Sequence, residues 1–165
     1  MSSFNEHITI HAPRAAVWGA LADIGAIHTW NPGVRDSRRT SEQAEGVGAM
    51  RSCDLGGRNY LHEAVTAWEP PERLTMTITE TNLPFARADI HFKLIEQGDQ
   101  TLVTVAPDYA LKFGPLGRLL DRFFVRSTYA KGMRGLLRGL KDHVESRAPS
   151  ASTSEPKTGA TDRRE

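Results

Sequence analysis

Apolar and polar residues alternate with period two through much of residues 32–111, and this alternation limits the folds open to the chain. Leu74, Met76 and Ile78 alternate with threonines, and a second run alternates Ile90 and Phe92 with charged or polar residues. This period is typical of strands that bury one face and expose the other. Gly, Pro, Asn and Asp between the runs indicate tight turns. The segment therefore predicts an antiparallel meander with one apolar and one polar face.

Helices are predicted before and after this meander in the sequence. A strand is expected over 4–11, and Pro13 then starts a short helix over 13–22, followed by a second short helix that ends near Thr29. Residues 115–147 predict one long helix, whose inward stripe is Leu116, Leu120, Phe123, Ser127, Ala130, Met133, Leu137, Leu140 and Val144. The middle of this stripe holds small or polar side chains. We therefore expect empty space beneath the helix, where a ligand can bind.

A single domain over residues 1–147 accounts for nearly all of the 165-residue chain. Residues 148–165 contain no large apolar side chain and are predicted to form a disordered tail. The apolar runs are far shorter than the roughly 20 residues that cross a bilayer, and the first residues lack the basic and apolar regions of a signal peptide. We therefore expect a cytoplasmic protein.

Composition disfavours two classes of function. A formal net charge of +1 is too small to predict nucleic acid as a partner. The six histidines and the single Cys53 show no metal-ligand spacing, so we expect neither a metal nor a cofactor. Cys53 also has no base nearby in the pattern that would activate it as a nucleophile.

Five short pieces of sequence add a further constraint. They are Ala12-Pro13 with Val17-Trp18 and Leu21-Ala22-Asp23; Trp30-Asn31-Pro32-Gly33-Val34; Glu63-Ala64-Val65 with Trp68-Glu69-Pro70-Pro71-Glu72-Arg73-Leu74; Phe92-Lys93-Leu94 with Gln100-Thr101-Leu102-Val103-Thr104; and Gly114-Pro115-Leu116-Gly117. In this order they resemble the START-like or SRPBCC superfamily, in particular its polyketide cyclase/dehydrase-like and lipid-binding members. The resemblance implies an α+β helix-grip fold, with a curved antiparallel sheet of about seven strands, two short helices and one long C-terminal helix. It also implies a cavity between the sheet and that helix.

The leading hypothesis is a carrier or binding protein, in preference to an enzyme, for a small hydrophobic ligand such as a lipid, a quinone or a polyketide-like aromatic. Trp30 is expected either to plug the core or to form the wall at the mouth of the cavity. The residues expected to contact the ligand are Trp30, Met76, Ile78, Ile90, Phe92, Val103, Val105, Phe123, Phe124, Ser127, Ala130 and Met133.

Two alternatives remain open from the sequence. A cyclase or dehydratase would use the same cavity, with Glu63, His62 or His28 as the acid or base. The strand pattern leaves open whether Glu63 or His62 points inward, and Arg51 or Arg58 could pair with a buried Glu63. A regulator would instead contact an anionic membrane or an acidic protein through basic residues of the long helix, namely Arg118, Arg122, Arg126, Arg134 and Arg138.

Overall fold

A computed structural model describes residues 2–112 and 124–147. Its strands are β1 (Ser2–Ser3), β2 (Glu6–Ile10), β3 (Asp36–Arg39), β4 (Met50–Gly56), β5 (Asn59–Glu69), β6 (Arg73–Thr81), β7 (Phe85–Gln97) and β8 (Gln100–Leu111). The helices are α1 (Arg14–Ala22), the short 3₁₀ helix η1 (Ile24–Thr29) and α3 (Arg126–Arg147). Residues 148–165, predicted as a disordered tail, lie outside the described residues.

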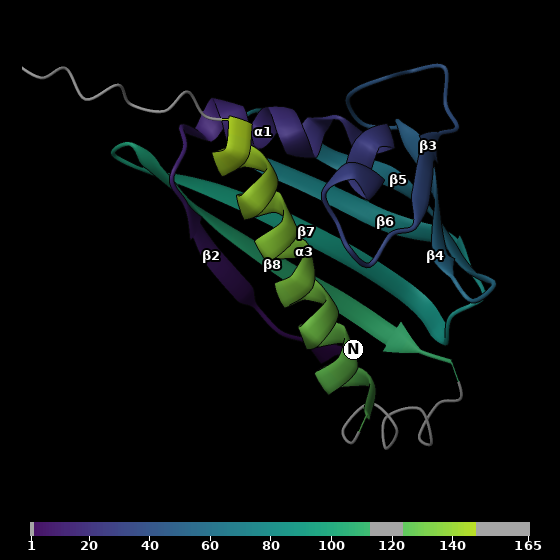
Figure 1. Cartoon of the computed structure of the whole chain (residues 1–165). Helices are drawn as coiled ribbons and strands as arrows, with labels where there is room; N and C mark the ends of the chain where they lie inside the picture. The colour runs from purple at the N-terminus through teal and green to yellow at the C-terminus, as the bar shows by residue number, and fades with distance from the viewer. Residues whose placement is uncertain (1, 113–123, 148–165) are drawn as a thin grey trace, which may run out of the picture.

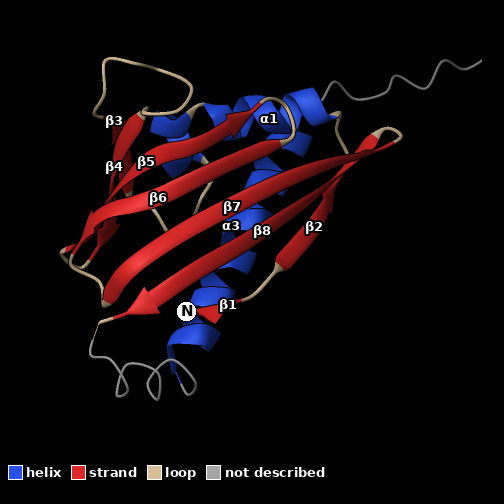
Figure 2. Cartoon of the chain, turned by 180° about the vertical axis from the view of Figure 1, so that it is seen from behind, coloured by secondary structure: helices blue, strands red, loops and turns tan. Residues whose placement is uncertain are grey.

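The strands form one curved antiparallel sheet, in the order β1-β8-β7-β6-β5-β4-β3, with β2 also paired to β8. All the helices lie on one face of this sheet, and α3 runs across the strands (Figure 1). Seen from behind, the opposite face carries no helix of the described residues (Figure 2). The predicted α+β helix-grip architecture is therefore confirmed, with eight strands where the pattern predicted about seven. The extra strand is the two-residue β1, which is too short to show a period.

Alternation along the central strands decides which side chains reach the concave face. Leu74 and Met76 of β6, and Ile90 and Phe92 of β7, are buried beneath the helices. The intervening threonines and charged residues point to the opposite face, where Thr75 approaches His91 at 3.0 Å. The predicted two-faced meander is thus present, and its apolar face forms the floor beneath α3.

Helix α3 covers the core with only one part of its length. Its described apolar residues gather toward its C-terminal half, where Leu137, Leu140 and Val144 are buried. Gly139 permits a close approach there, because a Cβ atom at this position would collide with the backbone carbonyl oxygen of Trp30. The C-terminal half of α3 therefore closes the core, and the space under the N-terminal half is left open.

Polar contacts hold α3 against β2. Arg134 forms an ion pair with Glu6 at 2.6 Å. Nearer the C-terminus, Glu145 accepts hydrogen bonds at 2.7 Å from both the His11 backbone N–H and the Lys141 ammonium group. Burial alone would raise the pKa of Glu145, but these bonds to Lys141 and His11 lower it to about 2. The helix is therefore anchored both near its middle and at the end that closes the core.

Candidate functional site: an apolar cavity under α3

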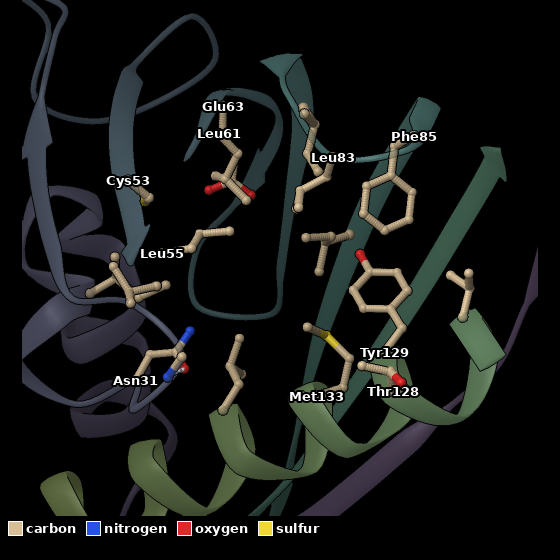
Figure 3. A pocket seen from close by; sticks show the side chains of 18 of the residues that line it. Asn31, Cys53, Leu55, Leu61, Glu63, Leu83, Phe85, Thr128, Tyr129 and Met133 are labelled. Carbon is tan, nitrogen blue, oxygen red and sulfur yellow. Dashed lines mark hydrogen bonds between the residues drawn. The ribbon is translucent and has the colours of Figure 1, made fainter. Parts of the chain in front are cut away.

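A cavity of about 420 Å³ lies between the concave face of the sheet and the N-terminal half of α3. Its floor comes from β4 to β7, one side comes from residues 27–34, and α3 forms the roof (Figure 3). Most lining residues are aliphatic or aromatic: Ile27, Val34, Leu55, Leu61, Ile78, Leu83, Pro84, Phe85, Ile90, Phe92, Phe124, Val125, Met133 and Leu136. Asn31, Gly33, Arg51, Cys53, Glu63, Thr128, Tyr129 and Gly132 complete the described lining.

Glu63 and Arg51 are the charged residues among the described lining. They lie directly opposite each other on the antiparallel strands β5 and β4. Arg51 Nε donates a hydrogen bond of 2.6 Å to Glu63 Oε2, and the two side chains are only 7% and 3% exposed. Burial by itself would lower the pKa of Arg51, but the negative charge of Glu63 raises it above its ordinary value. This buried pair therefore introduces no net charge into the cavity.

Cys53 is buried beside this pair and is a poor nucleophile. Burial raises the pKa of the Cys53 thiol to about 12, because the thiolate would be poorly solvated, and the positive charge of Arg51 offsets this only in part. The thiol therefore stays protonated at neutral pH.

Tyr129 contributes the hydroxyl group that reaches furthest into the apolar space. It projects from the first turn of α3 (Figure 3), and no described residue hydrogen-bonds to its buried oxygen. Burial raises the pKa of Tyr129, and the negative charge of Glu63 acts in the same direction. The group therefore remains a neutral hydrogen-bond donor.

Five of the residues predicted to contact a ligand line this cavity: Ile78, Ile90, Phe92, Phe124 and Met133. Met76, Val103 and Val105 lie on the same concave face but are fully buried in the packed part of the core. The period-two pattern identifies the buried face of a strand. It does not show which residues of that face line a cavity and which are packed directly against a helix. Phe123 lies outside the described residues.

Three further expected contacts lie elsewhere. Trp30 is buried in the core outside the cavity lining, beneath the close approach of Gly139, although its neighbour Asn31 lines the cavity. Ser127 and Ala130 of α3 do not line the cavity, because the face that does so carries Thr128, Tyr129 and Gly132. The sequence pattern allows this other face too, since Leu136 lies one heptad after Tyr129 and both therefore fall on the same side of the helix.

Of the three acid-base candidates, one lines the cavity and two lie outside its lining. Glu63 points into the cavity within its ion pair. His62 is its neighbour on β5 and points to the opposite face, 3.7 Å from Glu80. His28 lies outside the cavity lining, where its ring Nδ1 is 2.7 Å from the Ser37 hydroxyl. The geometry therefore brings none of these histidines to Glu63.

Two further properties are determined for the described residues. No helix among them is long and apolar enough to span a membrane. Within the same ranges, no three His, Cys, Asp or Glu side chains are grouped as metal ligands would be. Of the basic residues predicted to contact a membrane or an acidic protein, Arg118 and Arg122 lie outside the described ranges. Arg134 is already paired with Glu6.

A curved antiparallel sheet that holds a long helix over an apolar cavity defines a protein of the helix-grip class. The sequence profile of the family described as "Polyketide cyclase / dehydrase and lipid transport" matches residues 1–145, and the chain belongs to this family. The predicted membership of the START-like or SRPBCC superfamily is thereby confirmed.

Solved structures show the same fold at low sequence identity. A Thermus thermophilus protein is 19% identical with a TM-score of 0.75, over 90% of this chain and 100% of that one. The Zhui aromatase/cyclase of a Streptomyces species is 15% identical with a TM-score of 0.76, over 92% and 98%. A START superfamily protein of Mycobacterium smegmatis is 17% identical with a TM-score of 0.73, over 87% and 97%. A search among curated proteins gave no significant match. At these identities the likeness establishes the fold alone.

Proposed function

We propose that the protein binds a small, largely apolar molecule in the cavity under α3 and acts as a carrier or binding protein. The observation that carries this proposal is a cavity of about 420 Å³ whose described walls are almost entirely apolar. Burial of apolar surface contributes about 25 cal/mol per Å², so a ligand that buries roughly 250 Å² gains about 6 kcal/mol before the cost of association. The family description, which includes lipid transport, agrees with this function.

A cyclase or dehydratase activity is the second candidate, because the Glu63 carboxylate and the Tyr129 hydroxyl both face the cavity. Several features favour binding over catalysis. Glu63 is engaged by Arg51, and the raised pKa values of Cys53 and Tyr129 keep both groups protonated at neutral pH, so that neither is available as a base. Mass spectrometry of the bound compound before and after incubation with the protein distinguishes the two functions, because a carrier returns its ligand unchanged.

Two other expectations stay predictions. One is a cytoplasmic location. The other is a contact between the basic face of α3 and an anionic membrane or an acidic protein.

The binding proposal is tested with N-phenyl-1-naphthylamine, a neutral apolar dye whose fluorescence rises when it leaves water. Gly132 lines the cavity, and an added Cβ there meets no atom within 4 Å, so Gly132→Trp fills the space without a backbone collision. Ser127→Trp adds the same bulk to an exposed position on the same helix, outside the lining. We expect one dye molecule to bind the wild type and Ser127→Trp, and binding to be lost in Gly132→Trp. Equal dye binding by all three folded proteins would place the site elsewhere.

A further inference from the structure

Tyr129 is held in the cavity wall by other aromatic rings. Its ring centroid lies 5.6 Å from that of Phe4, 5.2 Å from that of Phe85 and 5.2 Å from that of Tyr109. Two of these contacts are edge-to-face, an arrangement that favours one ring orientation. These rings come from β7, β8 and the segment that precedes β2. The direction of the Tyr129 hydroxyl is therefore fixed by the fold before any ligand arrives.

That hydroxyl is a buried donor without an acceptor among the described residues. An unsatisfied buried polar group is unfavourable by about 1–3 kcal/mol, and such groups in folded proteins call for an explanation. Tyr129 lines the cavity, and its oxygen points from the wall toward the cavity interior (Figure 3). A ligand oxygen placed there would supply the missing acceptor. A phenylalanine would fill the same ring position without this penalty.

The charges of the cavity restrict the ligand further. Arg51 and Glu63 neutralise each other at 2.6 Å, and the other described lining residues are uncharged at neutral pH. An anionic ligand such as a fatty acid would lose its hydration without gaining a free cation among these residues. A neutral acceptor carries no such penalty.

We propose that Tyr129 orients the ligand by donating a hydrogen bond to the carbonyl oxygen of a neutral, otherwise apolar compound, such as a ketone, an ester or a quinone. This inference rests on the proposed binding function and specifies its ligand class. The apolar walls supply most of the affinity, and Tyr129 selects compounds that carry an acceptor at one place.

Three probes of similar shape separate these contributions. They are 2-acetylnaphthalene, which carries a neutral carbonyl, 2-isopropylnaphthalene, which carries no acceptor, and 2-naphthoate, which is an anion. Affinities are measured by calorimetry for the wild type, Tyr129→Phe and Tyr60→Phe. Tyr60 is the matched control, because its hydroxyl bonds to Glu80 on an exposed surface outside the cavity lining.

We expect the wild type to bind the ketone most tightly and the naphthoate most weakly. Tyr129→Phe should weaken ketone binding about 3- to 10-fold, the effect of one neutral hydrogen bond, and leave the hydrocarbon unaffected. Tyr60→Phe should change neither affinity. The carbonyl stretching band of the bound ketone should lie at lower wavenumber in the wild type than in Tyr129→Phe.

The contrary results are distinct. Equal weakening of the ketone and the hydrocarbon by Tyr129→Phe would mean that Tyr129 only shapes the cavity, which overturns this inference and leaves the binding function standing. Tighter binding of 2-naphthoate than of the ketone would overturn the neutral ligand class. If none of the probes bound the wild type, the proposed function would fail and this inference with it.

Discussion

Replacement of Glu63 by glutamine tests how the buried charge pair is held. The substitution keeps the size of the side chain and removes the charge that faces Arg51 Nε at 2.6 Å. An exposed ion pair contributes at most about 1 kcal/mol. With side-chain exposures of 7% and 3%, however, this pair is almost completely removed from water. Loss of one partner from such a pair leaves an uncompensated buried charge, so we expect Glu63→Gln to lower the free energy of unfolding by about 3–5 kcal/mol.

Urea unfolding followed by circular dichroism measures this loss, and the melting temperature should fall by about 10 °C. Glu80→Gln on the exposed face of the neighbouring strand β6 is the control, with an expected change within about 0.5 kcal/mol. A double variant, Arg51→Met with Glu63→Leu, should recover most of the lost stability, because it leaves no unpaired charge. A loss below about 1 kcal/mol for Glu63→Gln, or a double variant no more stable than the single one, would refute the reasoning.

Three more predictions concern the rest of the described chain. The pKa of Glu145 is lowered from 4.5 to about 2, so its contribution to stability is present above about pH 5 and is lost as the pH falls from 4.5 toward 2. Unfolding measured at pH 6 and pH 3 should therefore show Glu145→Gln destabilised by about 1–2 kcal/mol at pH 6 and by less at pH 3; an equal loss at both would contradict this. Gly139→Ala should destabilise the protein by about 1–3 kcal/mol in chemical denaturation because of its backbone collision, whereas Gly132→Ala should stabilise it by roughly 0.5–1 kcal/mol; the opposite order would mean that α3 docks differently. Cys53 should react with a thiol reagent at neutral pH far more slowly in the folded protein than in urea, since it is 1% exposed with a pKa of about 12; equal rates would show an accessible thiolate.

The architecture could be predicted from the sequence because its signals are local. Alternation along β6 and β7 identifies a two-faced sheet, and Pro13 marks the start of α1 to within one residue. The sparse middle of the last helix likewise predicts empty space beneath it. These features depend on residues close together in the chain, where a period or a turn residue is a sufficient signal.

The details of the cavity depend on packing between distant segments, which no local period records. The apolar stripe that includes Leu137 predicts Ser127 and Ala130 to face inward, whereas the cavity is lined by the adjacent positions Thr128, Tyr129 and Gly132. A change of one residue rotates a helical position by about 100°, enough to move it off the wall. The inward direction of Glu63 follows from its burial in the cavity lining opposite Arg51, which the strand pattern does not record.

Tyr129 illustrates a further limit of sequence reasoning. A tyrosine on an amphipathic helix fits either the core or the surface. Tyr129 matters because its hydroxyl has no hydrogen-bond partner among the described residues. The sequence cannot show this, because it depends on the three-dimensional arrangement around the hydroxyl.

The central claim, that the cavity under α3 holds a small apolar ligand, is tested most directly by mass spectrometry of organic extracts. The protein is purified from the organism that makes it, alongside the cavity-filling variant Gly132→Trp. The account predicts one apolar compound with a neutral carbonyl, near one molecule per chain in the wild type and absent from the variant. Extracts that are the same for both folded proteins would contradict it.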